Sequence, residues 1–116
     1  MTTTDFPAAR RFAIAPPGAY AVLRRAIVER RPMTAVYDDY VRDFCPRLLG
    51  RDRAGQPALL AYQYGGGRPG GLPSQGAWTF FVVDRLHDLR LNDDDWAAAT
   101  PPCELHGGMA EIDVAA

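Results

Sequence analysis

Lysine is absent from this sequence of 116 residues, and all 13 basic residues are arginine. The phosphate-binding loop of P-loop nucleotide hydrolases needs a lysine, so its absence excludes that class of site. Long apolar runs are absent as well, and none approaches the roughly 18 residues that a membrane-spanning helix requires. We therefore expect no membrane span.

Cysteine is scarce. Cys45 and Cys103 are widely separated, which favours free thiols in a reducing compartment over a disulfide-stabilised secreted domain. The run Arg10-Arg11-Phe12 is similar to a twin-arginine export signal, but the apolar stretch after it ends at Pro16-Pro17 and is too short for one. The sequence therefore predicts a cytoplasmic protein.

Side chains that carry chemistry do not form a recognisable cluster. Cys103 and His106 have a separation found in metal sites, but zinc takes three or four ligands, and only Cys45 and His87 remain as candidates. A hydrolase built on either thiol needs a base and an orienting group, and no local residue supplies them. The acidic run at 93–95 lacks the spacing of a calcium loop. We expect no catalytic residues, no metal and no cofactor.

Charge is unevenly distributed along the chain, although the net charge is only −1. All 13 arginines lie before residue 92, together with eight acidic residues, whereas residues 92–116 carry the other six acids and no base. A basic body favours anionic partners, and an acidic tail can fold back over it. Chance segregation on a solvated surface remains the alternative.

The length is that of a single domain with a helix near its start. Residues 1–18, rich in threonine, alanine and proline, predict a flexible lead-in. Over residues 19–31, Tyr20, Leu23 and Ile27 recur on one helical face. Pro32 ends this predicted amphipathic helix, because it disfavours helical backbone angles in the residue before it.

Short apolar runs bounded by turn residues follow the helix and predict about five antiparallel strands. These runs cover residues 34–37, 40–45, 58–64, 77–83 and 86–91. In the second run, alternation places Tyr40, Arg42 and Phe44 on the same side. One helix with about five short strands is the pattern of a small barrel, because closure removes exposed edges. Residues 97–116 form an acidic C-terminal tail to which the sequence assigns no element.

A glycine-rich stretch, residues 65–77, separates two predicted strands and holds six glycines and two prolines. Residues 65–70 match the spacing of a dinucleotide-binding fingerprint, but that fingerprint opens a helix, which these prolines and glycines forbid. We expect a hairpin with an oversized flexible loop tipped by Arg68. Such a loop is either functional or disordered, and composition leaves both readings open.

Several segments together resemble the WYL domain family. They are residues 26–37 (AIVERRPMTAVY), 44–50 (FCPRLLG), 58–63 (ALLAYQ) and 78–86 (WTFFVVDRL). The most specific piece is FVVDRL at 81–86, and the resemblance is to the short stand-alone branch of the family. Pro57, Ala58 and Leu59 occupy the positions that give the family its name, so the aromatic pair is missing there.

The resemblance implies a fold and a function. The expected fold, over residues 19–96, is a mainly β, small Sm-like or SH3-like antiparallel barrel preceded by one amphipathic helix. WYL domains are ligand-sensing modules of bacterial regulators, so the resemblance implies a non-enzymatic sensing module with a regulatory role. The expected ligand bears phosphate, as single-stranded nucleic acid or a nucleotide does.

Five residues are candidates for binding the ligand, and Arg85 is the one carried over from the matching position in the family. They are Arg85, Tyr62, Gln63, Arg68 and Arg47. Arg85, in the Asp84-Arg85 motif, is the main candidate for anion contact, because a guanidinium is a planar, permanently charged fork that suits phosphate. An ion pair of Arg85 with Asp84 or with a neighbouring strand is the alternative. Tyr62 and Gln63 are candidates for stacking and hydrogen bonding.

A second hypothesis is a protein-interaction or homo-oligomeric assembly module with no nucleic-acid ligand. Sm-like barrels can pair through strand edges, and the acidic tail could dock on the basic body of a neighbour. One structural observation separates the two hypotheses. Clustering of Arg47, Arg68 and Arg85 on one exposed face favours ligand binding, and scattering of the three removes that support.

Overall fold

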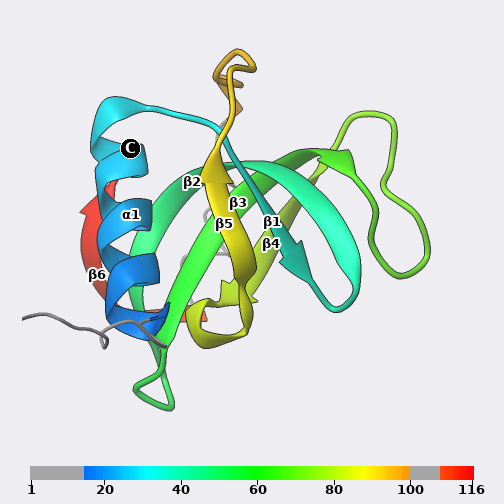
Figure 1. The fold of residues 1–116 in the computed structure, drawn as a ribbon. Coiled ribbons are helices and arrows are strands. Elements are labelled where there is room, and N and C mark those ends of the chain that lie inside the picture. The colour runs from blue at the N-terminus through cyan, green and yellow to red at the C-terminus, as the bar shows by residue number, and fades with distance from the viewer. Residues whose placement is uncertain (1–14, 100–107) are drawn as a thin grey trace, which may run out of the picture.

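The computed structural model describes residues 15–99 and 108–116. Predictions for residues 1–14, Cys103 and His106 therefore lie outside the described residues. The elements are α1 (Ala15–Glu29), β1 (Met33–Tyr37), β2 (Tyr40–Asp52), β3 (Pro57–Gly66), β4 (Ala77–Val82), the short 3-10 helix η1 (Val83–Arg85), β5 (His87–Leu91) and β6 (Met109–Ala115). The described chain is thus mainly β, with one N-terminal helix followed by a six-stranded antiparallel sheet (Figure 1).

Helix α1 follows the amphipathic pattern that the sequence predicts. Leu23, Ala26 and Ile27 are buried in the core, whereas Arg24 and Arg25 are exposed. Burial of this apolar face, rather than helix propensity, is what stabilises a helix of this length.

The ends of α1 differ from the prediction. The helix begins at Ala15 instead of residue 19, because prolines are tolerated in the first turn, where backbone N–H groups have no helical partner. It ends at Glu29 instead of residue 31, since Arg30 adopts a left-handed φ of 53°. Residues 15–18 therefore belong to the helix and not to the predicted lead-in.

Strand β2 is the centre of the sheet. The strand order is β4-β3-β2-β1-β5, and β6 pairs with β2 off this path. The first part of β2 pairs with β1, the last part pairs with β6, and nearly its whole length pairs with β3. Register shifts interrupt the β2–β3 ladder at two places. Such bulges bend a strand and raise its twist, which accounts for the strong curvature of β2 (Figure 1).

The predicted closed barrel of about five strands is wrong in two respects. The sheet has six strands, and it is not closed: β4 and β5 are its ends, joined through η1, with no ladder between them in the described residues. Helix α1 packs against β2, η1 and β6. The helix therefore covers apolar surface of the open sheet, whereas the prediction expected closure to remove the exposed strand edges.

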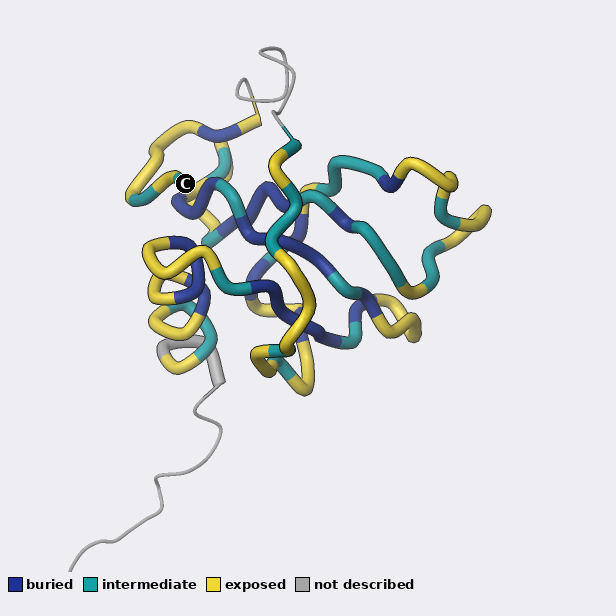
Figure 2. The backbone as a smooth tube through the Cα atoms, turned by 90° about the horizontal axis from the view of Figure 1, so that it is seen from above, coloured by how far each residue is buried: buried dark blue, intermediate teal, exposed yellow. Residues whose placement is uncertain are grey.

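The core lies between α1 and the inner face of the curved sheet. Its buried members are Leu23, Ala26, Ile27, Met33, Ala35, Tyr37, Phe44, Leu49, Leu59, Ala61, Phe81, Val83 and Leu86. The Tyr37 and Phe81 rings meet edge to face with centroids 4.8 Å apart, a favoured aromatic geometry. Figure 2 shows buried residues along the strands and exposed residues in the hairpin turns and on the outer side of α1.

Strand β6 lies in the C-terminal tail, for which the sequence predicts no element. It adds to the second half of β2, with Gly50 opposite Ile112. A Cβ atom on Gly50 would lie 1.9 Å from the backbone oxygen of Glu111. Glycine at position 50 is therefore what allows β6 to approach β2.

A search of the described helices for length and hydropathy finds none that could cross a lipid bilayer.

Candidate functional site

The five residues predicted from the sequence divide between the two faces of the sheet. Tyr62 and Gln63 are neighbours on β3, and successive side chains of a strand point to opposite faces. Gln63 is fully buried on the inner side, whereas Tyr62 is half-buried and its ring lies 5.3 Å from that of Trp78. A single site on one face cannot contain both side chains.

Gln63 is hydrogen-bonded to a buried arginine, Arg42, which the prediction from the sequence did not include among the site residues. Arg42 on β2 is only 3% exposed. Its Nη1 donates to Gln63 Oε1 at 3.3 Å, and its Nη2 donates to the Tyr37 carbonyl oxygen at 3.1 Å. The burial of Arg42 could be predicted from the sequence. Strand alternation places Arg42 on the same face as the apolar Phe44, so burial of Phe44 implies that Arg42 also points into the core.

The Arg42 guanidinium lies among three aromatic rings. Its central carbon is 5.4 Å from the ring centroid of Tyr37 and 5.7 Å from those of Tyr40 and Phe81. Ring faces attract cations, so these contacts offset part of the cost of removing the charge from water. None of the three rings, however, neutralises that charge.

Arg42 also lacks a bonded anion among the described residues. Both of its acceptors, Gln63 Oε1 and the Tyr37 carbonyl oxygen, are neutral, and its buried Nε has no hydrogen-bond partner in the described part of the chain. Burial lowers the pKa of Arg42; the charge of Asp38 raises it, and that of Arg68 lowers it. Arginine nevertheless stays protonated in proteins, so a positive charge remains in the core without a bonded counter-ion.

Gln63 also fixes the base of the glycine-rich loop. Its Nε2 donates to the carbonyl oxygens of Gly65 and Gly67, each at 2.9 Å. Gly66 between them has φ of 81°, and a Cβ there would lie 2.1 Å from the Val41 oxygen. This geometry holds the start of the loop against β2, and places Arg68 close enough for its charge to affect the pKa of Arg42.

Arg85 in η1 reaches the same end of the sheet. Its side chain is 54% exposed, its guanidinium carbon lies 4.8 Å from the Tyr37 ring centroid, and its Nη2 forms an ion pair with Asp38 Oδ1. Arg42 contacts the same Tyr37 ring, so the guanidinium groups of Arg42 and Arg85 lie close to each other. The ion pair is the alternative that the sequence left open for Arg85, with the partner on the turn after β1 rather than at Asp84.

We call this region the arginine end; it consists of Arg42, Arg68 and Arg85 together with Tyr37 and Asp38. Asp38 is the acidic residue whose charge acts on Arg42 in the described chain. Of the three arginines, Arg85 bonds this carboxylate, Arg42 has only neutral acceptors among the described residues, and the charge of Arg68 acts on Arg42. The chemistry that this arrangement favours is attraction of an anion.

Arg47 lies away from the arginine end, on the Tyr62 side of the sheet. Its guanidinium carbon is 5.7 Å from the ring centroids of both Trp78 and Trp96. It donates hydrogen bonds to the backbone oxygens of Ala99 and Ala116. These contacts tie two later segments of the chain to β2. Arg47, Arg68 and Arg85 therefore do not form one exposed face, and the support that their clustering would have given to ligand binding is removed.

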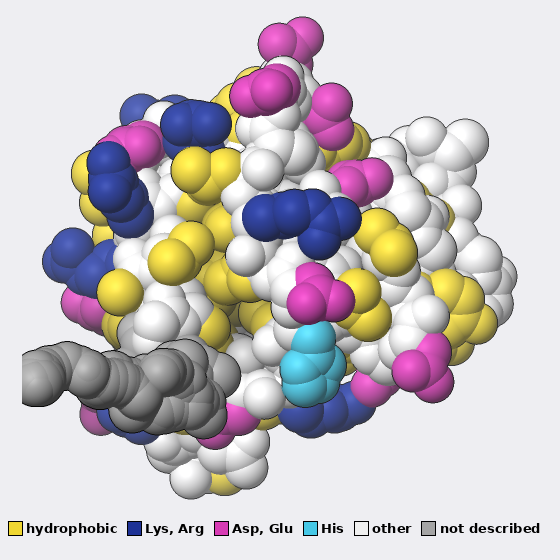
Figure 3. All heavy atoms as spheres, viewed as in Figure 1, with side chains coloured by type: hydrophobic (Ala, Val, Ile, Leu, Met, Phe, Trp, Pro, Cys, Tyr) yellow, Lys and Arg dark blue, Asp and Glu magenta, His cyan; other side chains and the backbone are white. Residues whose placement is uncertain are grey.

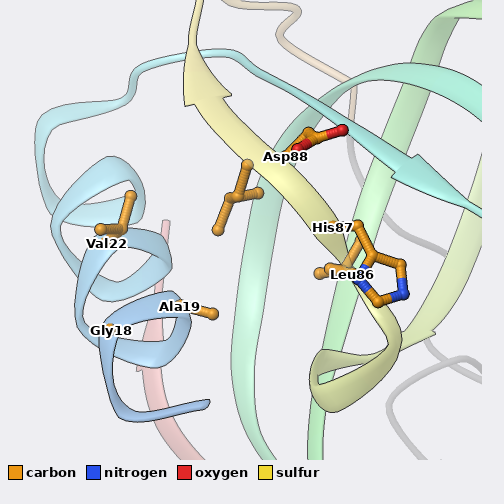
Figure 4. Close-up of a pocket in the computed structure, with 7 residues that line it drawn as sticks. Gly18, Ala19, Val22, Leu86, His87 and Asp88 are labelled. Atoms are coloured by element: carbon orange, nitrogen blue, oxygen red, sulfur yellow. The ribbon is translucent and has the colours of Figure 1, made fainter. Parts of the chain in front are cut away.

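A separate groove lies between α1 and β5 (Figure 4). It has a volume of about 320 Å³, with Ala19, Val22, Leu86 and Leu89 among its lining residues and His87 and Asp88 beside them. Figure 3 shows apolar side chains gathered between α1 and β5, with basic and acidic side chains interspersed around them. None of the five predicted site residues lines this groove.

A hydrogen-bonded network joins the segment after β5 to the sheet. Asn92 Nδ2 donates to Tyr64 Oη at 2.9 Å and to Thr34 Oγ1 at 3.0 Å. Tyr64 in turn donates to Asp94 Oδ2 at 2.7 Å, and burial together with this bond raises the pKa of Tyr64 above its ordinary value. The network consists of satisfied neutral and acidic groups and has no unpaired cation, so we assign it a structural role.

Comparison with known proteins found no match to this chain among family models, curated proteins or solved structures. The resemblance to the WYL family therefore stays a prediction from the sequence.

Proposed function

We propose that this protein is a non-enzymatic sensing module that binds a phosphate-bearing ligand, such as single-stranded nucleic acid or a nucleotide, at the arginine end. The observation that carries the proposal is the Arg42 guanidinium, which is buried and bonds no anion within residues 15–99 and 108–116. Burying a charge is costly unless that charge is paired. An anion bound nearby would lower that cost in the complex, which favours binding of phosphate.

Arg85 and Arg68 are the residues suited to contact such a ligand. Arg85 is about half exposed and presents a planar fork of donors, which matches the geometry of phosphate oxygens. Arg68 is partly exposed on the glycine-rich loop. Arg42 itself is too buried to touch a ligand, so it acts through its electrostatic field, which falls off slowly in the low dielectric of the core.

In this proposal the ring that stacks on a base of the ligand is Tyr40 and not Tyr62. Tyr62 lies on the opposite side of the sheet from Gln63 and is engaged with Trp78 and the Gln75 backbone oxygen. Tyr40 is 40% exposed, and its ring lies beside Arg42 at the arginine end. An exposed ring beside guanidinium groups is the arrangement with which single-stranded nucleic acids are bound.

The finer description of the fold belongs to the same proposal. The strand order β5-β1-β2-β3-β4, with α1 before it and η1 between β4 and β5, supports an Sm-like or SH3-like arrangement related to WYL domains. The open edges and the additional β6 are where this chain departs from a simple barrel of that type.

Fluorescence anisotropy tests the proposal, with short labelled single-stranded DNA and RNA titrated at low and at high salt. We expect saturable binding that weakens with salt, because phosphate contacts release counter-ions. Arg85→Ala should weaken binding about tenfold or more, since hydrogen bonds to charged groups contribute roughly 1.5–3 kcal/mol. Arg51→Ala, at the other end of β2, is the matched control and should bind like wild type. Failure of the wild type to bind at low salt would remove the nucleic-acid ligand.

The assembly hypothesis has one observation in its favour, the groove between α1 and β5, beside which Val22 and Leu91 are exposed. Against it, the β1–β5 register shifts between Thr34 and Val36, and Asp88 has a left-handed φ of 51°. Irregularities and charges on an edge strand disfavour strand addition. Light scattering at increasing protein concentration tests this alternative, which requires a rise in mass.

A further inference from the structure

We propose that Asp38 is an internal competitor for the ligand: its carboxylate occupies, on Arg85, the position that a phosphate group of the ligand takes, and binding of the ligand displaces it. This inference rests on the proposed function and specifies how the site is regulated. It makes Asp38 a residue that lowers affinity, in contrast to the arginines around it.

The contacts of Arg85 support the exchange. In the described structure its guanidinium bonds a carboxylate of the same chain while its face lies over the Tyr37 ring. A carboxylate and a phosphate present similar oxygen acceptors to the guanidinium fork. Both partners of the ion pair are substantially exposed, with 54% and 44% of their side-chain surfaces accessible to solvent. An anion can therefore approach from solvent without prior unfolding.

The exchange is energetically feasible because both Arg85 and Asp38 are exposed. Ion pairs between exposed side chains contribute little to stability, because water screens them and ordering two side chains is entropically costly. The phosphate of a ligand brings at least as much negative charge as Asp38 and can also contact Arg68. The ligand therefore binds Arg85 more favourably than Asp38 does. Its binding free energy is nevertheless reduced by the free energy needed to break the Arg85–Asp38 ion pair.

The turn that carries Asp38 has an unusual backbone. Asp38 and Asp39 form the two-residue connection between β1 and β2, and their φ values are 50° and 66°. Two-residue hairpin turns of this kind favour asparagine or glycine, because both central residues take left-handed angles. Aspartate tolerates this conformation, and at position 38 its charge faces Arg85.

Asp39 provides an internal comparison. It has the same charge, the same turn and the same left-handed backbone as Asp38. The ion pair of Arg85 is with Asp38 and not with Asp39. Removing either charge changes the net charge of the protein equally, so a difference between the two variants reports the specific contact of Asp38.

The experiment compares Asp38→Asn and Asp39→Asn with wild type, with a short labelled oligothymidylate in the anisotropy assay. Asparagine keeps the shape of the side chain and suits the left-handed backbone, so both variants should fold. We expect Asp38→Asn to bind about three- to tenfold more tightly, as removal of one nearby like charge implies. Asp39→Asn should change the affinity less than about twofold.

Three results would overturn the inference. Equal tightening by both variants would mean a general effect of net charge. An unchanged or weakened affinity of Asp38→Asn, with binding by wild type intact, would overturn the inference and leave the proposed function standing. No binding by wild type or either variant would overturn both. Amide NMR signals of Asp38 and Asp39 supply a second measurement, and we expect them to shift in wild type as the oligothymidylate is added.

Discussion

Replacing Arg42 by methionine separates the two roles that a buried guanidinium can have. If Arg42 mainly holds the fold together, its loss should be strongly destabilising. If it is retained for its charge, the fold should tolerate the change while anion binding suffers. Methionine is flexible and of related shape, so it can fill the space among the Tyr37, Tyr40 and Phe81 rings.

The magnitude follows from the contacts of Arg42. Two hydrogen bonds, at 3.3 and 3.1 Å, contribute about 1 kcal/mol each. Three ring contacts contribute about 0.5–2 kcal/mol each, with the larger value for a desolvated cation. Against them stands the desolvation of a cation with no bonded anion, which costs several kcal/mol. The opposing contributions are comparable, so we expect Arg42→Met to change the free energy of unfolding by no more than about 2 kcal/mol.

Urea unfolding followed by tryptophan fluorescence measures this difference, with and without added inorganic phosphate. Phosphate should stabilise the wild type, because a ligand that binds the folded state adds about 1.4 kcal/mol at ten times its dissociation constant. It should stabilise Arg42→Met much less. Loss of more than about 4 kcal/mol in the variant, or equal stabilisation of both proteins by phosphate, would refute the reasoning.

Three further predictions concern the fold. Gly50→Ala should detach β6, since a Cβ would lie 1.9 Å from a backbone oxygen of that strand, and hydrogen exchange should show loss of amide protection in β6. Asn92→Ala should lower the free energy of unfolding by about 1–3 kcal/mol, because three hydrogen bonds of its side chain are lost, and urea unfolding checks this. Tyr64 has a raised pKa when folded, so its contribution to stability is present below pH of about 10 and declines above it. Tyr64→Phe should therefore show a smaller loss of stability between neutral and strongly alkaline pH than wild type does, as thermal melts at both pH values would report.

The sequence predicts the local elements well because their causes are local. Periodic burial of Leu23 and Ile27 indicates α1, and alternation with turn residues indicates the strands. Boundaries are less certain, as the start of α1 at Ala15 shows. Whether the sheet closes into a barrel could not be predicted from the sequence, because closure depends on which strand edges meet after the chain has folded. The pairing of β6 with β2 depends in the same way on a contact between segments far apart in the sequence.

The candidate site was predictable only in part, for similar reasons. The position of Arg85 follows from a motif, but its partner Asp38 lies 47 residues away, and no local pattern links the two. The alternation of β3 is enough to separate Tyr62 from Gln63 at the level of the sequence, since neighbouring residues on a strand face opposite ways. The same rule, applied to β2, places Arg42 with Phe44 on the buried side. What the sequence cannot supply is the absence of a bonded carboxylate around Arg42.

An NMR titration of the arginine side chains shows whether the charge of the arginine end attracts a phosphate-bearing ligand. Protein labelled with nitrogen-15 would be titrated with a short oligothymidylate at low salt, and the Nε–H signals of Arg42, Arg85 and Arg47 followed. We expect saturable shifts of the Arg42 and Arg85 signals, with Arg47 unchanged because it lies on the other side of the sheet between two tryptophans. Shifts confined to Arg47, or no shift of any arginine signal, would contradict this expectation.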